Sequence, residues 1–224
     1  MMGFSHVVSG FTAGLALLPV APVSGVVEQV AWVLMWGGAT LLPDLDSVGA
    51  SASRMWGGLS RLISQGVAAV SGGHRWGTHD LVLGPAVFGG LASLAVLIPG
   101  LSVAVMAVSA GLAMQGLHVT RMWRLGPAAN LLISWIGAWW IVTHGWVAVD
   151  WWLPLAIAGG VAVAIMGDWL TIEKVPIPLV WLRDRSKRWG LAAFRTGDVV
   201  ESALIAPGLS LATALLTARA VGMI

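Results

Sequence analysis

The chain has 224 residues, of which 58% are apolar and only 10% are charged, with a formal net charge of +2 and a mean hydropathy of +0.86. Ordinary soluble domains carry about a quarter charged residues, so this composition excludes a soluble globular domain, a disordered chain and a nucleic-acid-binding module. The absence of cysteine excludes disulfides and thiolate metal sites.

Apolar segments long enough to cross a bilayer follow one another along most of the chain. A spanning helix needs about 20 mainly apolar residues, and the candidates are residues 4–20, 26–43, 81–98, 102–119, 127–148, 151–171 and 199–219. Pro99 and Gly100 divide one long apolar run into a helical hairpin. No charged region precedes the first segment and no small-residue cleavage site follows it, so we expect a retained helix rather than a signal peptide. The sequence predicts an all-α, polytopic integral membrane protein with about six or seven transmembrane helices in a single domain, residues 1–224.

Two segments differ from this pattern. Between residues 52 and 71 the apolar side chains share one helical stripe, formed by Trp56, Leu59, Ile63, Val67 and Val70. This spacing and the modest hydrophobicity predict one amphipathic helix that lies in the membrane interface. Residues 173–198 hold most of the charge and are predicted to form a polar loop.

The basic residues predict the orientation of the chain. Eleven of the twelve fall in the loops after the second, fourth and sixth spans, which share one side in an alternating topology; they are Arg54, Arg61, Arg75, Arg121, Arg124, Lys174, Arg183, Arg185, Lys187, Arg188 and Arg195. The positive-inside rule makes this side cytoplasmic, and the N-terminus and the loop 173–198 lie there too. Only Arg219 falls on the opposite side. The lipid bilayer is the expected partner, and no nucleic-acid partner is expected.

Ionisable residues at membrane depth are costly, by about 2.5 kcal/mol or more each at the bilayer centre, and by default they mark function. The predicted topology places seven at the cytoplasmic ends of helices: His6, Asp44, Asp46, His74, His79, His118 and Asp168. His144 lies toward the other face and is excluded. Histidines and carboxylates gathered at one level make a nitrogen and oxygen metal site that zinc, manganese or iron would accept. A divalent ion there would lower the pKa of a bound water to about 7 and polarise a phosphoryl or carbonyl oxygen, which is hydrolase chemistry.

Several of these residues also have a purely structural interpretation. Asp44 and Asp46 could simply flank a helix end, and His118 could be an interfacial residue. We interpret Thr78 as an N-cap and Asp80 as a first-turn residue facing the positive end of the next helix, so both are predicted to be structural.

A series of short motifs runs along nearly the whole chain in a recognisable order. They are Met2-Gly3-Phe4-Ser5-His6, Leu42-Pro43-Asp44-Leu45-Asp46, Gly73-His74-Arg75 with Thr78-His79, Gly167-Asp168-Trp169-Leu170-Thr171, and Phe194-Arg195-Thr196-Gly197 with Glu201. Their combination resembles the bacterial inner-membrane, metal-dependent hydrolase family of the YdjM type. The resemblance implies a multi-pass hydrolase of the bacterial inner (cytoplasmic) membrane that binds a divalent metal near its cytoplasmic face.

Carried over by position, the resemblance implies a set of metal ligands, namely His6, Asp44, Asp46, His74, His79 and Asp168. Arg75 and Arg195 are expected to neutralise a phosphate or another anionic group of the substrate. The family is distantly similar to zinc phospholipases C and single-strand nucleases. This similarity favours phosphoester or lipid-derived substrates and puts zinc ahead of manganese or iron as the expected ion.

The sequence departs from the family pattern at Ala164. The family usually has a histidine there, four residues before the aspartate that matches Asp168, so that both face the metal from one helix. Three explanations stay open: a lost ligand, replacement by His118, or a non-catalytic protein with a structural or degenerate metal site. A transporter is disfavoured because the ionisable residues cluster at one end and no inverted repeat is evident.

Overall fold

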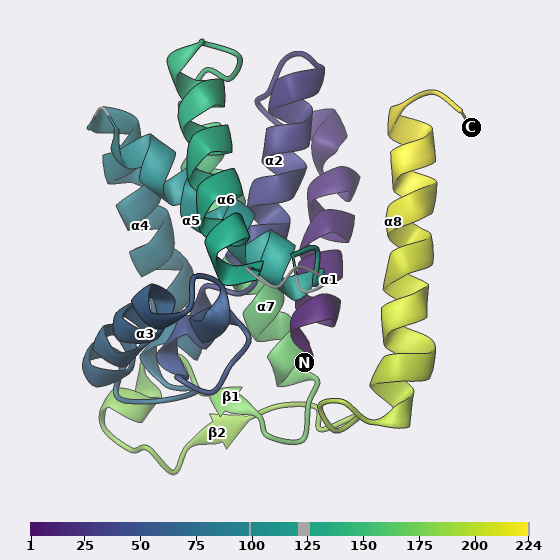
Figure 1. The fold of residues 1–224 in the computed structure, drawn as a ribbon. Coiled ribbons are helices and arrows are strands. Elements are labelled where there is room, and N and C mark those ends of the chain that lie inside the picture. The colour runs from purple at the N-terminus through teal and green to yellow at the C-terminus, as the bar shows by residue number, and fades with distance from the viewer. Residues whose placement is uncertain (99, 121–125, 224) are drawn as a thin grey trace.

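The computed structural model describes residues 1–98, 100–120 and 126–223, and within them helices dominate (Figure 1). The α-helices are α1 (Gly3–Ala16), α2 (Val26–Ala39), α3 (Gly58–Ser71), α4 (Leu83–Leu97), α5 (Leu101–Gly116), α6 (Gly126–Thr143), α7 (Trp152–Trp169) and α8 (Ala206–Ala220). Short 3-10 helices are η1 (Leu18–Val20), η2 (Pro43–Asp46), η3 (Ala52–Arg54), η4 (Gly77–His79) and η5 (Val180–Leu182), and η6 (Glu201–Ile205) is a π-helical turn that leads into α8. The strands β1 (Val175–Pro176) and β2 (Arg188–Trp189) pair antiparallel. The predicted all-α class is confirmed.

Each predicted apolar segment contains a helix, but the helices differ in length. Among the described residues, three helical segments are long and apolar enough to cross a membrane: Val26–Asp46, Trp152–Trp169 and Glu201–Ala220. The helices α4 and α5 are apolar but shorter. The chain is thus compatible with a membrane protein. Pro99, Arg121 and Arg124, on which part of the predicted hairpin and topology rests, lie outside the described residues.

The helix α2 forms the centre of the bundle and packs against α1, α5 and α7, while α4 covers α7 and α6 covers α5. Glycines allow these close approaches. A Cβ on Gly160 of α7 would lie 2.5 Å from the Trp36 carbonyl oxygen, and a Cβ on Gly38 of α2 would collide with the Ser109 carbonyl group of α5. Small residues at contacts between apolar helices are typical of membrane bundles.

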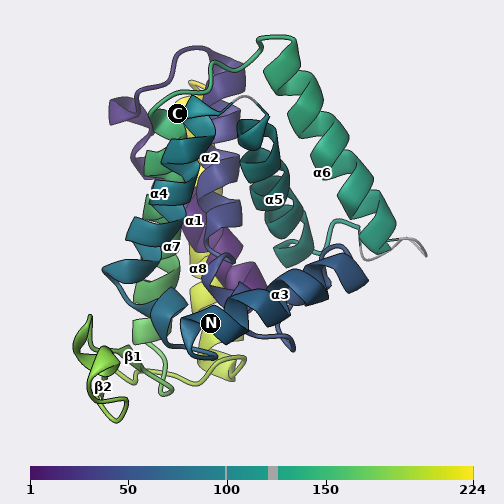
Figure 2. The same cartoon turned by 90° about the vertical axis from the view of Figure 1, so that its left-hand side faces the viewer.

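The helix α3 lies across the end of the bundle near the N-terminus, roughly at right angles to the longer helices (Figure 2). Its buried face is polar. The Ser64 hydroxyl donates to the Leu45 carbonyl oxygen (2.6 Å), and the Ser60 hydroxyl donates to the Ser53 carbonyl oxygen (2.9 Å). The opposite face exposes Leu59, Leu62, Ile63 and Val70. These exposed apolar side chains suit the predicted interfacial helix, but α3 begins at Gly58 rather than at residue 52, and Trp56 of the predicted stripe is buried outside it.

The polar loop 173–198 packs against the same end of the bundle, and hydrogen bonds to Asp80 hold it there. The Asp80 Oδ1 atom accepts the Val82 and Leu83 N–H groups at the start of α4, and Oδ2 accepts the Leu179 N–H and the Trp181 indole N–H. Burial alone would raise the pKa of Asp80, but these hydrogen bonds outweigh it and hold the pKa below its ordinary value. The predicted structural role of Asp80 therefore agrees with the structure.

Candidate metal centre

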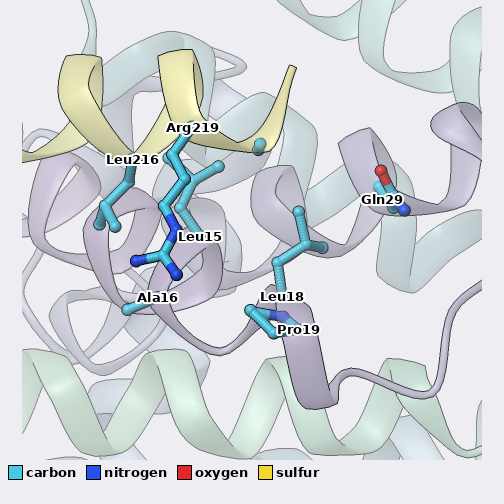
Figure 3. Close-up of a pocket in the computed structure, with 8 residues that line it drawn as sticks. Leu15, Ala16, Leu18, Pro19, Gln29, Leu216 and Arg219 are labelled. Carbon is cyan, nitrogen blue, oxygen red and sulfur yellow. The ribbon is translucent and has the colours of Figure 1, made fainter. Parts of the chain in front are cut away.

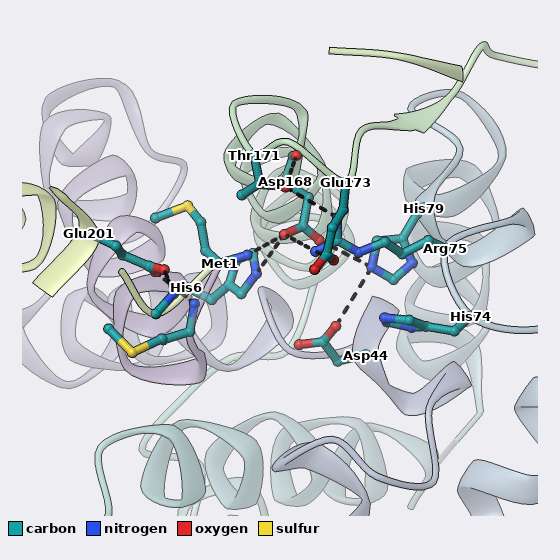
Figure 4. A network of polar contacts seen from close by, with 12 residues as sticks. Met1, His6, Asp44, His74, Arg75, His79, Asp168, Thr171, Glu173 and Glu201 are labelled. Atoms are coloured by element: carbon teal, nitrogen blue, oxygen red, sulfur yellow. Dashed lines mark hydrogen bonds and ion pairs between the residues drawn. The ribbon is translucent and has the colours of Figure 1, made fainter. Parts of the chain in front are cut away.

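The six predicted ligand residues come from five segments that meet at one end of the bundle (Figure 4). His6 lies near the start of α1, Asp44 and Asp46 lie in η2 directly after α2, His74 lies in the loop after α3, His79 lies in η4, and Asp168 lies in the last turn of α7. Because α1 begins at this end while α2 and α7 finish there, residues far apart in the sequence become neighbours.

Asp44, His74 and His79 form a group that could hold a metal ion. One ligand atom from each lies within 4.8 Å of the others. The His79 Nε2 atom is buried and lies 3.6 Å from Asp44 Oδ1 and 3.3 Å from Asp168 Oδ2, and within the described residues it makes no hydrogen bond. A buried imidazole nitrogen that faces two carboxylates fits a site for a divalent cation.

The same carboxylates control the charge of His79. Burial alone lowers the pKa of His79, but the neighbouring carboxylates of Asp168, Asp44 and Asp46 outweigh burial and hold the pKa well above its ordinary value. The imidazole therefore carries a proton while no cation is bound. A metal ion has to displace this proton when it binds.

Asp46 orients both histidines rather than facing the group itself. Its Oδ1 atom lies 2.7 Å from His74 Nδ1, and its Oδ2 atom lies 3.2 Å from His79 Nδ1. Oδ2 also accepts the Thr78 hydroxyl (2.5 Å) and the Arg75 backbone N–H (2.9 Å). With both Nδ1 atoms held by one carboxylate, the two Nε2 atoms are left for an ion, which is the arrangement common to metal-binding histidines. Asp46 was predicted either as a ligand or as a residue that orients the ligands, and these contacts of both oxygens fit the second role.

Asp168 is buried beside the group, and its carboxylate contacts several basic groups. Its Oδ1 atom lies 3.1 Å from Arg75 Nη2 and 3.4 Å from His6 Nε2, and it also contacts the Met1 amino group. Arg75 in turn lies 3.1 Å from Glu173 Oε2. A buried carboxylate in the last turn of an apolar helix is thus paired, so removal of one partner would leave an uncompensated buried charge.

Arg75 is itself buried at 6% exposure, and within the described residues its Nε atom has no hydrogen-bond partner. Its backbone has a φ of 62°, a left-handed conformation that is uncommon outside glycine. A cavity of about 460 Å³ lies beside Arg75, and Asp44, His74 and His118 also line it. The cavity is therefore lined by the cation Arg75, by the imidazoles of His74 and His118, and by the carboxylates of Asp44 and Glu173, while the buried His79 and Asp168 do not line it.

Other predicted residues lie apart from this group. Arg195 is exposed, and its backbone N–H donates to Asp198. His118 lines the cavity but is not a member of the Asp44, His74 and His79 group. Ala164 is buried in α7, one turn before Asp168.

The predicted N-cap role of Thr78 is wrong, because its hydroxyl donates to Asp46 and the N-cap position of α4 is Val82. The prediction also missed the role of Glu173, which was placed only in a polar loop and instead pairs with Arg75. The sequence holds no signal for this pairing, because Glu173 and Arg75 are far apart along the chain and meet only in the tertiary structure.

Comparisons with known proteins identify no relative. No family model matches the chain, and neither a curated protein nor a solved structure matches it. The resemblance to hydrolases of the YdjM type stays a prediction, and the case for the site rests on its geometry.

Proposed function

We propose that the chain is a membrane-embedded, metal-dependent hydrolase that cleaves phosphoesters or lipid-derived substrates. The observation that carries this proposal is the group of Asp44, His74 and His79, held in place by Asp46, beside the buried cation Arg75. Zinc is the proposed ion, with manganese and iron as alternatives, because nitrogen and oxygen donors suit all three.

Different residues have different roles in the proposed metal site. Asp44, His74 and His79 would hold the ion, Asp168 contacts His79, and His6 contacts Asp168 through its other carboxylate oxygen. A divalent ion supplies an activated water and polarises a phosphoryl oxygen.

Arg75 is the proposed contact for the anionic group of the substrate. Its guanidinium lies between the buried Asp168 and Glu173, whose side chain is 51% exposed. A phosphate could therefore take the place of Glu173 without disturbing Asp168, since an arginine binds both anions through the same N–H donors. Arg195 was the second predicted contact for the anionic group. It is exposed in the adjoining loop, and we keep it in the proposal as a secondary contact.

The proposed setting is the cytoplasmic face of the bacterial inner membrane, with six or seven spans. The apolar helices and the gathering of basic residues at the site end support this orientation. The apolar outer face of α3, which lies across the same end, supports a position of the site at the level of the lipid headgroups. A substrate could then enter from the lipid phase or from the cytoplasm.

Metal analysis of the purified protein tests the proposal directly. We expect about one equivalent of zinc, manganese or iron per chain, and loss of both metal and phosphodiesterase activity in His79→Ala and Asp44→Asn. Asp184→Asn is the matched control, because Asp184 is half-exposed and its carboxylate contacts, among the described residues, only the nearby Ser186 and Lys187. The proposal fails if wild-type protein saturated with each of the three ions hydrolyses neither bis-p-nitrophenyl phosphate nor phospholipid, or if the two variants keep wild-type metal content.

A non-catalytic protein with a structural metal site is the second candidate, and Ala164 favours it. In this case the ion raises the thermal stability while no ester is turned over. Ala164→His separates the two candidates: activity that appears only in this variant supports a degenerate site, whereas activity already present in the wild type rejects it.

A further inference from the structure

An apolar groove is lined by residues of α1, α2 and α8 (Figure 3). It lies at the end of these helices that is opposite the N-terminus and the candidate metal centre (Figure 1). It consists of two adjoining pockets of about 550 and 460 Å³ that share Leu15, Leu18, Gln29 and Ala220. Each volume lies within the range of roughly 300–1,000 Å³ that is typical of small-molecule sites. The groove is therefore large enough for a substantial part of a lipid.

The groove exists because α8 packs mainly on α1 rather than on α2. The hydroxyls of Thr12 and Thr213 lie 2.9 Å apart and join α1 to α8. Beyond this contact the α2 surface stays open: Val26 and Val30, which line the larger pocket, are 75% and 60% exposed. This exposed valine surface of α2 suits contact with the acyl chain of a lipid.

The smaller pocket adds a single positive charge to this apolar surface. Figure 3 shows the Arg219 guanidinium directed from α8 into the pocket, near Leu15 and Ala16. The negative C-terminal end of α8 accounts for a basic residue in its last turn, but not for its direction toward α1. In the described parts of the chain no carboxylate lies within ion-pair distance of Arg219. A cation at one end of an apolar groove matches the polarity of an anionic amphiphile.

We propose that this groove binds one phospholipid, with its phosphate at Arg219 and an acyl chain along the wall formed by Val26, Val30 and Val33 of α2. Arginine presents a planar set of N–H donors that matches a phosphate group. A second copy of the chain would cover the apolar wall but would leave Arg219 without an anion unless it brought a carboxylate. The site is independent of the proposed hydrolase function, because it lies at the opposite end of the bundle.

Lipid binding to delipidated protein in detergent, followed by native mass spectrometry, tests this proposal. Dioleoylphosphatidylglycerol is compared with dioleoylglycerol, which has the same chains but no phosphate. We expect one tightly bound phosphatidylglycerol per wild-type chain, about fivefold weaker binding in Arg219→Gln, which is the order of the contribution of one basic residue near an anionic surface, and no change for dioleoylglycerol. Val30→Trp, which fills the larger pocket, is expected to lose both lipids.

Arg61→Gln is the matched control, since Arg61 is exposed on α3 at the other end of the molecule. The proposal is overturned if Arg219→Gln retains wild-type affinity for phosphatidylglycerol, or if Arg61→Gln weakens binding equally, because the effect is then one of surface charge in general. A lipid-free dimer that Val30→Trp dissociates also overturns it. Unfolding temperatures without lipid show whether each variant folds. If Val30→Trp does not fold, the binding measurement on Arg219→Gln decides whether the proposal stands.

Discussion

Replacing Asp46 by asparagine tests whether this residue orients the metal ligands or is one of them. The carboxylate holds His74 at 2.7 Å and His79 at 3.2 Å, which are two of the three residues of the candidate metal group. In Asp46→Asn the shape is kept, but one carboxylate oxygen becomes an NH₂ group, which can only donate. The NH₂ group cannot accept a hydrogen bond from an imidazole N–H, so one side chain can no longer accept from the Nδ1 atoms of both His74 and His79.

The expected loss follows from this double role. Removing a hydrogen-bonding partner behind a metal-binding histidine typically costs 10–100-fold in metal affinity. Because Asp46 supports two histidines, we expect the upper end of this range, about 100-fold, which corresponds to about 2.7 kcal/mol.

The assay is metal binding in chelator-buffered solutions, with stoichiometry measured by elemental analysis and folding checked by thermal unfolding. Asp44→Asn provides the comparison, since loss of a direct ligand should leave no stoichiometric metal at any concentration used. Our reasoning is refuted if folded Asp46→Asn binds metal as tightly as the wild type. If Asp46→Asn and Asp44→Asn behave alike, Asp46 is a ligand.

Three further predictions concern stability. Gly38→Ala should lower the free energy of unfolding by about 1–3 kcal/mol, because the added Cβ would meet the Ser109 carbonyl group and overpacking of this kind has that cost. Gly137→Ala is the control: Gly137 faces open space, so this change should leave the denaturant midpoint unchanged or higher. The folded-state pKa of Asp80 lies below its ordinary value. Asp80 therefore stabilises the fold above the unfolded pKa of about 3.9 and loses this contribution as the pH falls through the lower folded value. The unfolding temperature of the wild type should fall more steeply below pH 4 than that of Asp80→Asn, and parallel curves would contradict this assignment. Removal of the metal by a chelator should lower the unfolding temperature and re-addition should restore it, with about 2.7 kcal/mol of stabilisation at an ion concentration 100 times the dissociation constant.

The helices could be predicted from the sequence because apolar runs and the Pro and Gly residues between them have simple physical meaning. The clustering of Asp44, His79 and Asp168 also followed from topology, since alternating helices bring the ends of α2 and α7 to one side. Their individual roles did not follow. Asp44 and Asp46 are equivalent in the sequence, and only the 3-10 turn at η2 shows that one faces the group while the other holds the histidines.

Two other features depend on tertiary structure in a way that local patterns do not express. The apolar stripe of α3 predicted an amphipathic helix correctly, but not that its serines would be the buried side, because hydroxyls can be buried when neighbouring carbonyl groups accept them. Thr78 has the residue type of an N-cap, yet α4 begins only at Leu83. The number of spans cannot be derived from apolar length alone, since α4 and α5 fall short of a full crossing.

The pairing of Arg75 with Asp168 has a consequence for how the protein is made. The two residues are 93 positions apart, and chains grow at roughly 5–20 residues per second, so about 5–20 s pass between their synthesis. During this interval α4, α5 and α6 are synthesised while Arg75 lacks the carboxylate that later accompanies it in the interior. Arg75 therefore has to stay hydrated until α7 has been made, and the polar centre closes only after the synthesis of Asp168.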